Sequence, residues 1–376
     1  MNGDRHSNES NRRRGGAEVR GGDSTVARRR AAYPFLLLQS PRLCASCSVL
    51  RDSFGLSKQF VRHLVVVVVV VVLMAAPWLP AVEQQDVIVV VGAPGEPEYA
   101  TRFQAWTAAW RQAGERAQAT VHLIGGEAAD QAEDADKQAL QRAIVAAASS
   151  GSAPLWIVLI GHGTYDGRTA KFNLRGADVA APELAGWLDG CGRPVVLLNT
   201  APASAPFLLA VSRPGRVVIS ATKSGRENNA TRFGGFVAEA LGKAEADIDQ
   251  DGQVSVLEVF LHAARAVEAS YKQDGLIATE HPLLDDNGDG RGTRADWFQG
   301  VWATKAAADG ATVDGIRAHQ IHLVPSDAER QLSNDDRTVR DQLEQDLATL
   351  RTQRKTLNDD EYYRQLESIM RKLSAI

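Results

Sequence analysis

The sequence predicts an α/β fold built on a mainly parallel sheet that is flanked by helices. Several apolar runs have the length of strands, and each is continuous rather than alternating in polarity, which is typical of strands buried on both faces. They cover Asp86–Val91, Thr120–Ile124, Leu155–Ile160, Pro194–Leu198 and Arg216–Ser220. Helical patterns separate them at Glu98–Glu115, Asp136–Ala148 and Pro182–Leu188. Strands that alternate with helices in this way indicate a parallel sheet covered on both sides. A last apolar run, Ile321–Val324, predicts an edge strand.

The distribution of charge divides the 376 residues into three parts. Residues 1–63 hold 12 Lys/Arg against 5 Asp/Glu, residues 64–82 hold no charge, and residues 83–376 hold 30 Lys/Arg against 41 Asp/Glu. An acidic body without a basic stripe argues against nucleic acid as a partner and is compatible with bound cations.

The uncharged segment 64–82 predicts export of the body. Its apolar core, Leu64 to Ala76, spans 13 residues, which suits a signal peptide and is short for a helix that crosses a membrane. We keep two alternatives, a cleaved signal peptide and an N-terminal membrane anchor. Either one leaves the body secreted, periplasmic or anchored to the membrane. The basic leader 1–63 is expected to be disordered, or untranslated if synthesis starts downstream of Met1.

The cysteines predict no disulfide bonds within the body, residues 83–376. Cys44 and Cys47 lie in the leader, and only Cys191 lies in the body, so no intrachain disulfide can form there.

Residues 247–258 match a twelve-residue EF-hand calcium loop. Calcium prefers six to eight oxygen ligands, and the Gly at position 6 of such a loop, here Gly252, allows its sharp turn. The ligand positions are filled in order by Asp247, Asp249, Asp251, the carbonyl of Gln253, Ser255 and Glu258. Helical patterns flank the loop at 232–241 and 256–271, as an EF-hand requires. We therefore predict Ca²⁺ here.

A second, looser calcium loop is predicted at 285–296. Its ligands would be Asp285, Asn287, Asp289, the carbonyl of Arg291, Thr293 and Asp296. It departs from the pattern because Asp stands at the last position and because Pro282 interrupts any helix before it.

Three stretches resemble the legumain-type cysteine peptidases and, more widely, the caspase-like fold. They are Ile160-Gly161-His162-Gly163, the strand that ends at Asn199, and Ile219 to Glu227. The resemblance covers roughly residues 84–325 and includes bacterial members with EF-hand-like loops and a helical tail. It implies that His162 is the catalytic base and that a cysteine follows the next strand in an Ala-Cys-x-Ser-Gly motif. Here the aligned residues are Ala201-Pro202-Ala203-Ser204-Ala205, so Pro202 stands at the cysteine position.

Two residues could replace the missing thiol. Ser204 lies two positions beyond it, and Cys191 lies before the strand, which places it at the opposite end of the sheet from His162. Asp166 either orients the imidazole or forms a turn, and His162 itself could be purely structural. Lys223, Arg226 and Glu227 could line a substrate pocket or simply be surface charges.

The last fifty residues, 326–376, predict a helical hairpin. Val339, Leu343, Leu347 and Leu350 recur at helical spacing, and Asn358 to Glu361 resembles a capping box that opens a second helix. The hairpin would pack on the body or pair with another copy through 333–376.

Together these patterns predict an exported, calcium-binding, caspase-like protein. Because Pro202 replaces the nucleophile, we expect a pseudoenzyme whose cleft holds a peptide or protein ligand. Two alternatives stay open: an active peptidase that uses His162 with Ser204 or Cys191, and a structural envelope protein organised by its tail.

Overall fold

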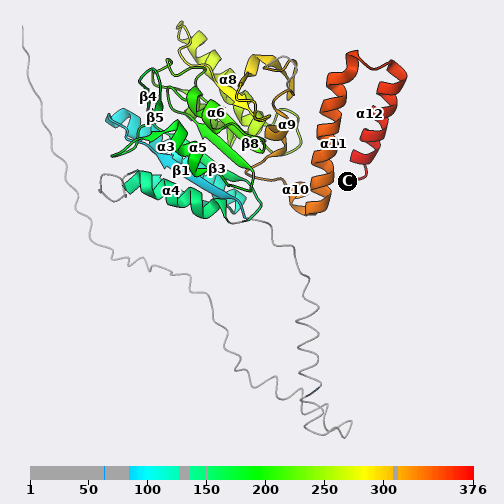
Figure 1. The fold of residues 1–376 in the computed structure, drawn as a ribbon, viewed down its shortest axis with the longest axis horizontal. Helices are drawn as coiled ribbons and strands as arrows, with labels where there is room; N and C mark the ends of the chain where they lie inside the picture. The colour runs from blue at the N-terminus through cyan, green and yellow to red at the C-terminus, as the bar shows by residue number, and fades with distance from the viewer. Residues whose placement is uncertain (1–62, 64–83, 127–134, 150, 308–311) are drawn as a thin grey trace, which may run out of the picture. The chain divides into compact units, whose positions relative to one another are not determined.

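The computed structural model describes residues 63, 84–126, 135–149, 151–307 and 312–376 (Figure 1). Residues 80–376 form one compact unit. Residues 1–62 of the leader and the segment 64–82, with the expected signal peptide or anchor, lie outside the described residues. Among the residues that are described, no helix combines the length and apolarity needed to cross a bilayer.

A seven-stranded, mainly parallel sheet forms the centre, with strand order β10-β9-β8-β7-β3-β1-β2. The strands that pair in parallel are β1 (Asp86–Val91), β2 (Thr120–Gly125), β3 (Leu155–Ile160), β7 (Val195–Asn199) and β8 (Arg216–Ser220). The short strands β9 (Leu283–Asp285) and β10 (Thr293–Arg294) add antiparallel pairs at one edge. All five strands expected from continuous apolar runs are confirmed.

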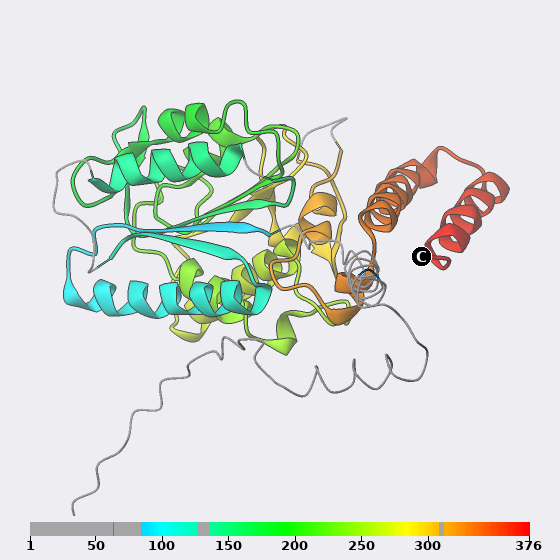
Figure 2. The same cartoon turned by 90° about the horizontal axis from the view of Figure 1, so that it is seen from below.

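Helices cover both faces of this sheet (Figure 2). One face packs against α3 (Pro97–Ala117), α7 (Phe233–Ala240) and α8 (Val256–Gln273). The other packs against α4 (Ala135–Ala148), α5 (Ala181–Trp187) and α6 (Ala205–Val211). The alternation of side chains along β1 explains the two layers, because Val87 and Val89 belong to the first core and Ile88 and Val90 to the second.

Smaller elements decorate the sheet. An antiparallel sheet contains β4 (Gly163–Tyr165), β5 (Ala170–Phe172) and β6 (Val179–Ala180), and a two-stranded ribbon contains β11 (Phe298–Gln299) and β12 (Trp302–Ala303). Single 3-10 turns lie at Ala244–Ala246, Ala295–Trp297 and Gln353–Lys355. The prediction of an edge strand at Ile321–Val324 is wrong. Only an isolated bridge between His322 and Ser255 forms there, because this segment crosses the end of the calcium loop instead of the sheet edge.

The tail forms two long antiparallel helices, α11 (Asn334–Thr352) and α12 (Asp359–Leu373), after the short helices α9 (Ile316–Gln320) and α10 (Asp327–Gln331). Ser333 caps α11 and Asn358 caps α12, each by accepting a backbone N–H three residues on. Helix α11 buries Leu343, Leu347 and Leu350, whereas Val339 is 52% exposed. Helix α12 buries no residue completely, so its apolar side is only partly covered.

Candidate functional site

The imidazole of His162 lies at the carboxyl end of β3, where ligands and catalytic groups gather in open α/β sheets. Its Nε2 lies 3.1 Å from the carbonyl oxygen of Pro94. A carbonyl can only accept, so Nε2 carries the hydrogen and Nδ1 is the basic nitrogen. The edges of two rings pack on the imidazole, with centroid distances of 4.6 Å for Tyr99 and 5.4 Å for Phe103. The ring is therefore firmly held on the side of α3.

Pro202 lies directly beside the residue that follows this histidine. Strands β3 and β7 are neighbours, so the two loops at their carboxyl ends meet. A Cβ added to Gly163 would lie 2.3 Å from the carbonyl oxygen of Pro202, which only a glycine permits. The loop that follows β7 thus lies next to His162-Gly163, and it presents proline there.

Ser204 is fully buried and bonded to a different loop. Its Oγ lies 3.1 Å from Oγ1 of Thr222 and accepts the Thr222 backbone N–H at 3.2 Å. In return, Oγ1 of Thr222 accepts the backbone N–H groups of Ser204 and Ala205. These reciprocal bonds tie the β7 loop to the β8 loop. The hydroxyl of Ser204 is therefore used to hold the two loops together, and it is not placed to attack a substrate.

Neither Cys191 nor Asp166 is placed beside the imidazole. Cys191 precedes β7, and its Sγ approaches the carbonyl of Arg193, at the end of the sheet opposite His162. The carboxylate of Asp166 accepts the backbone N–H groups of Thr169 and Arg168, and these bonds lower its pKa. Asp166 therefore closes a turn and does not orient the imidazole.

A second histidine, which the sequence analysis did not single out, adjoins the β7 loop. Nδ1 of His281 lies 2.6 Å from a carboxylate oxygen of Glu227. The other oxygen of that carboxylate accepts the backbone N–H of Lys223 at 2.9 Å. The carbonyl of Glu227 accepts the N–H of Ala203, whose backbone is left-handed with φ of 54°. Glu227 thus shapes the loop instead of standing free in solvent, while Arg226 lies in the same turn.

The first predicted calcium loop gathers carboxylates around one point. Oxygens of Asp247, Asp249 and Glu258 lie within 4.8 Å of one another, and within the described residues this is the only such acidic or histidine group. Glu258 stands in the first turn of α8, where it accepts the backbone N–H of Ser255 at 2.8 Å and that of Ile248 at 2.7 Å. These are the residues that the sequence pattern predicts for positions 1, 3 and 12.

The remaining predicted ligands lie in the turn of the loop. Burial raises the pKa of Asp251, and the charges of Asp249 and Asp247 push it in the same direction. The backbone at Gly252 is left-handed with φ of 87°, as the tight turn requires. The side chain of Gln253 bonds to Asp251 and to the backbone of Ser326, which leaves its carbonyl for the ligand role that the pattern gives it.

The second calcium loop is buried at its start and open at its end. Asp285 is fully buried, and its Oδ1 accepts from Ser212 and from the backbone of Gly288. Its Oδ2 is buried without a hydrogen-bond partner among the described residues. Asn287 and Asp289 accept backbone N–H groups inside the loop. The loop's last residue, Asp296, is exposed and pairs with Arg294.

Two further carboxylates have no role in the sequence pattern: Asp286, the second residue of this loop, and Asp314, which lies outside it. Asp286 accepts the backbone N–H groups of Gly315 and Ala318 at the start of α9. Asp314 accepts two backbone N–H groups of the loop and the hydroxyl of Thr293. Burial, with the charge of Asp286, raises the pKa of Asp314 to about 8. Thr293 thus turns its hydroxyl to Asp314. A motif that runs through consecutive residues cannot reveal a partner twenty residues away.

Comparisons with known proteins find structural similarity only. No family model matches the chain, and no curated protein matches it. The Drosophila initiator caspase Dronc aligns at 12% identity over 56% of this chain and 83% of its own, with a TM-score of 0.39. Caspase-1 from Spodoptera frugiperda aligns at 10% identity over 54% and 86%, with a TM-score of 0.38. A protein from Geobacter sulfurreducens aligns at 12% identity over 54% and 92%, with a TM-score of 0.36.

The chain's own strand order establishes the α/β architecture with its mainly parallel sheet. The similarities to solved structures concern the fold alone. The narrower resemblance to legumain-type peptidases stays a prediction.

Proposed function

We propose that this chain is an exported, calcium-binding, peptidase-like protein that has lost hydrolysis and uses its cleft to bind a peptide or protein. One observation carries the proposal: the carbonyl of Pro202 lies against Gly163, immediately after the histidine that would serve as base. Proline offers neither a nucleophile nor a backbone N–H for an oxyanion.

The two substitutes fit hydrolysis less well. Ser204 would have to break its bonds to Thr222 and leave a fully buried position. Cys191 would have to act from the other end of a five-residue strand. Since a base must reach the proton that it abstracts, neither arrangement supplies a nucleophile activated by His162.

A peptide-cleavage assay tests the lost activity. The purified full chain would be offered a mixed peptide library with calcium and with chelator, beside His162→Ala and Ser204→Ala. We expect no cleavage above that of buffer in any sample. Cleavage by the wild type that disappears in His162→Ala would establish the alternative, an active peptidase. Cleavage that survives both substitutions would point to a contaminating enzyme, so the assay would be repeated after further purification until it is absent.

Calcium is the ligand that the two loops suit best. The first loop supplies three converging carboxylates, and the second supplies a buried carboxylate oxygen without a partner. Like charges held this close repel one another unless a cation lies among them. Equilibrium dialysis against calcium should give one tight site, or two if the second loop also binds; no retained calcium would refute this part.

A scaffolding role through the tail is the second candidate. Helix α12 leaves Tyr363 and Met370 half exposed and buries no residue completely, so its apolar side could pair with another copy. Sedimentation of the full chain, compared with a chain that ends at residue 325, would detect self-association. Export rests on the segment 64–82, and N-terminal sequencing of the mature protein would test it.

A further inference from the structure

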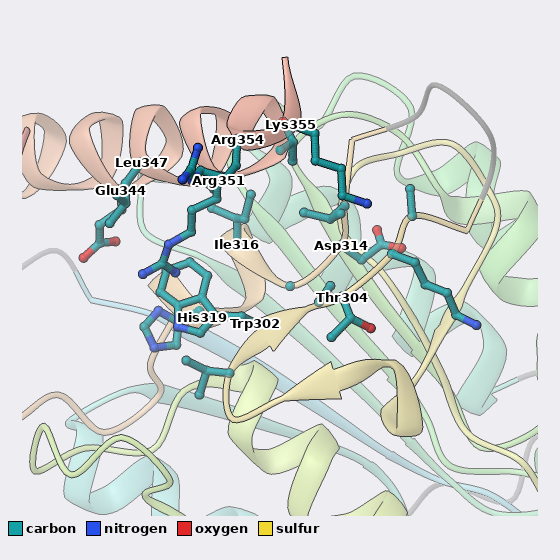
Figure 3. Close-up of a pocket in the computed structure, with 18 of the residues that line it drawn as sticks. Trp302, Thr304, Asp314, Ile316, His319, Glu344, Leu347, Arg351, Arg354 and Lys355 are labelled. Carbon is teal, nitrogen blue, oxygen red and sulfur yellow. The ribbon is translucent and has the colours of Figure 1, made fainter. Parts of the chain in front are cut away.

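A cavity of about 720 Å³ lies between the tail and the ribbon formed by β11 and β12 (Figure 3). Its walls come from α9, from both tail helices and from the chain around β12. Pockets that hold small molecules commonly measure 300–1,000 Å³ and are mostly apolar with a few polar groups. This cavity has the size of such a pocket, and neither His162 nor Pro202 lines it.

Apolar side chains line much of the cavity. Leu347 and Ala348 come from α11, and both are buried. Met370 and Leu373 come from α12, and Ile316 comes from α9. These residues offer a surface for an apolar group between the tail and the body.

Positive charge gathers around these apolar walls. Lys305, Arg351 and Lys355 all line the cavity, and none has a carboxylate within ion-pair distance in the described part of the chain. The ammonium of Lys305 lies 4.0 Å from the ring centroid of Trp297, which does not line the cavity, so Arg351 and Lys355 are the cations left for a ligand. The guanidinium carbon of Arg351 lies 3.6 Å from the ring centroid of Trp302, and Figure 3 shows the two side chains stacked. A cation held over a ring keeps its N–H groups available to an anion at the edges.

The two carboxylates that line the cavity are already engaged. Asp314 receives the hydroxyl of Thr293 and two backbone N–H groups. Glu344 receives the side-chain amide of Gln320 at 2.9 Å. Neither forms an ion pair with the three cations, which leaves the cavity with a surplus of positive charge.

We propose that this cavity binds a small amphiphilic anion, with a carboxylate head at Arg351 and Lys355 and an unbranched apolar body against the tail helices. Charge complementarity selects an anion, and the apolar walls select a chain of several methylene groups. The proposal is independent of calcium and of the cleft at His162.

Calorimetric titration of the full chain with decanoate tests it. The titration would run in chelator, below the micelle concentration of the ligand. We expect saturable binding with one ligand per chain. In the double variant Arg351→Gln with Lys355→Gln, removal of two charge-assisted contacts should weaken binding about tenfold or more. The matched control, Arg371→Gln with Lys372→Gln, removes two cations of α12 that do not line the cavity and should bind as the wild type does.

Two further arms separate a specific site from adsorption of a detergent-like molecule. Decyltrimethylammonium has a chain of the same length with the opposite charge and should not bind. Thr352→Trp would fill the cavity from an exposed position and should also abolish binding, while circular dichroism checks that the variant is folded. Equal binding of both ligands, equal binding by all variants, or no saturable binding of decanoate would each overturn the proposal.

Discussion

The Nε2 atom of His319 lies 2.8 Å from Oδ2 of Asp249, and this contact joins helix α9 to the first calcium loop. Asp249 holds the third position of that loop, seventy residues earlier in the chain. His319 also lines the cavity beneath the tail, where its ring lies 6.4 Å from that of Trp302. His319 therefore links the first predicted calcium loop to the lining of the cavity.

Removal of His319 should weaken calcium binding. A hydrogen bond to a carboxylate that coordinates a metal fixes the orientation of that carboxylate. The loss of such a bond commonly lowers metal affinity 10–100-fold. We expect His319→Ala to reduce calcium affinity about tenfold in a titration with a competing chelator. His122→Ala is the control, because that histidine lies on β2, far along the chain from the loop. Unchanged affinity in His319→Ala would show that the contact plays no part in binding.

Calcium should stabilise the fold through Glu258. A ligand that binds only the native state adds about 2.7 kcal/mol at one hundred times its Kd. In Glu258→Gln the loop loses its closing carboxylate, so most of this calcium-dependent increment should disappear. Thermal unfolding with calcium and with chelator measures the increment within each variant. Glu367→Gln, an exposed acid of α12, should keep the full increment. Retention of that increment by Glu258→Gln would contradict a calcium site in this loop.

The stability of the calcium-free protein should fall as pH rises, partly through Asp314. Its pKa is about 8 in the folded state, against about 3.9 for an unperturbed Asp. The folded state therefore binds the proton of Asp314 more tightly than the unfolded state does. The stability that this proton contributes is fully present below about pH 4 and is lost between about pH 4 and 8. In Asp314→Asn the fall should be shallower, whereas the exposed Asp327→Asn should follow the wild type. Urea unfolding in chelator at several pH values measures the slopes; parallel slopes in all three proteins would refute the assignment.

Ser204→Ala should destabilise the protein without revealing catalysis. The substitution leaves the buried N–H of Thr222 without its acceptor, at a cost of about 1–3 kcal/mol. Ser374→Ala, at the exposed end of α12, should change stability by less than about 0.5 kcal/mol. Urea unfolding of the three proteins gives the comparison. A Ser204→Ala protein as stable as the wild type would remove the structural role that we assign to this hydroxyl.

The five parallel strands were predictable because they are continuous apolar runs, and β1 begins and ends where the sequence indicates. The short antiparallel strands β9 and β10 were not predicted. The convergence of Asp247, Asp249 and Glu258 was predictable because it depends on spacing within twelve residues, while their role as calcium ligands stays a prediction. Helix α6 was not predicted, because its apolar run is only seven residues long. The pairs His319–Asp249 and His281–Glu227 join residues that are far apart in sequence, so only the fold reveals them.

Ile321–Val324 shows how composition can mislead. The run is apolar enough for an edge strand, yet Ile321 and Leu323 are buried against the first core while the carbonyl of Ile321 accepts the N–H of Val256. The apolar side chains are buried in the core, and the backbone carbonyl of Ile321 is paired with the first residue of α8. The segment therefore needs no partner strand in the sheet.

Covalent trapping tests the central claim most directly, because it records nucleophilic attack itself instead of turnover. The full chain would be incubated with peptides that carry a fluorophosphonate or an epoxide, with calcium, and its intact mass measured beside that of His162→Ala. We predict no adduct that depends on His162, since the residue beside that histidine is Pro202. A single adduct on Ser204 or Cys191 in the wild type, absent from His162→Ala, would contradict the loss of hydrolysis.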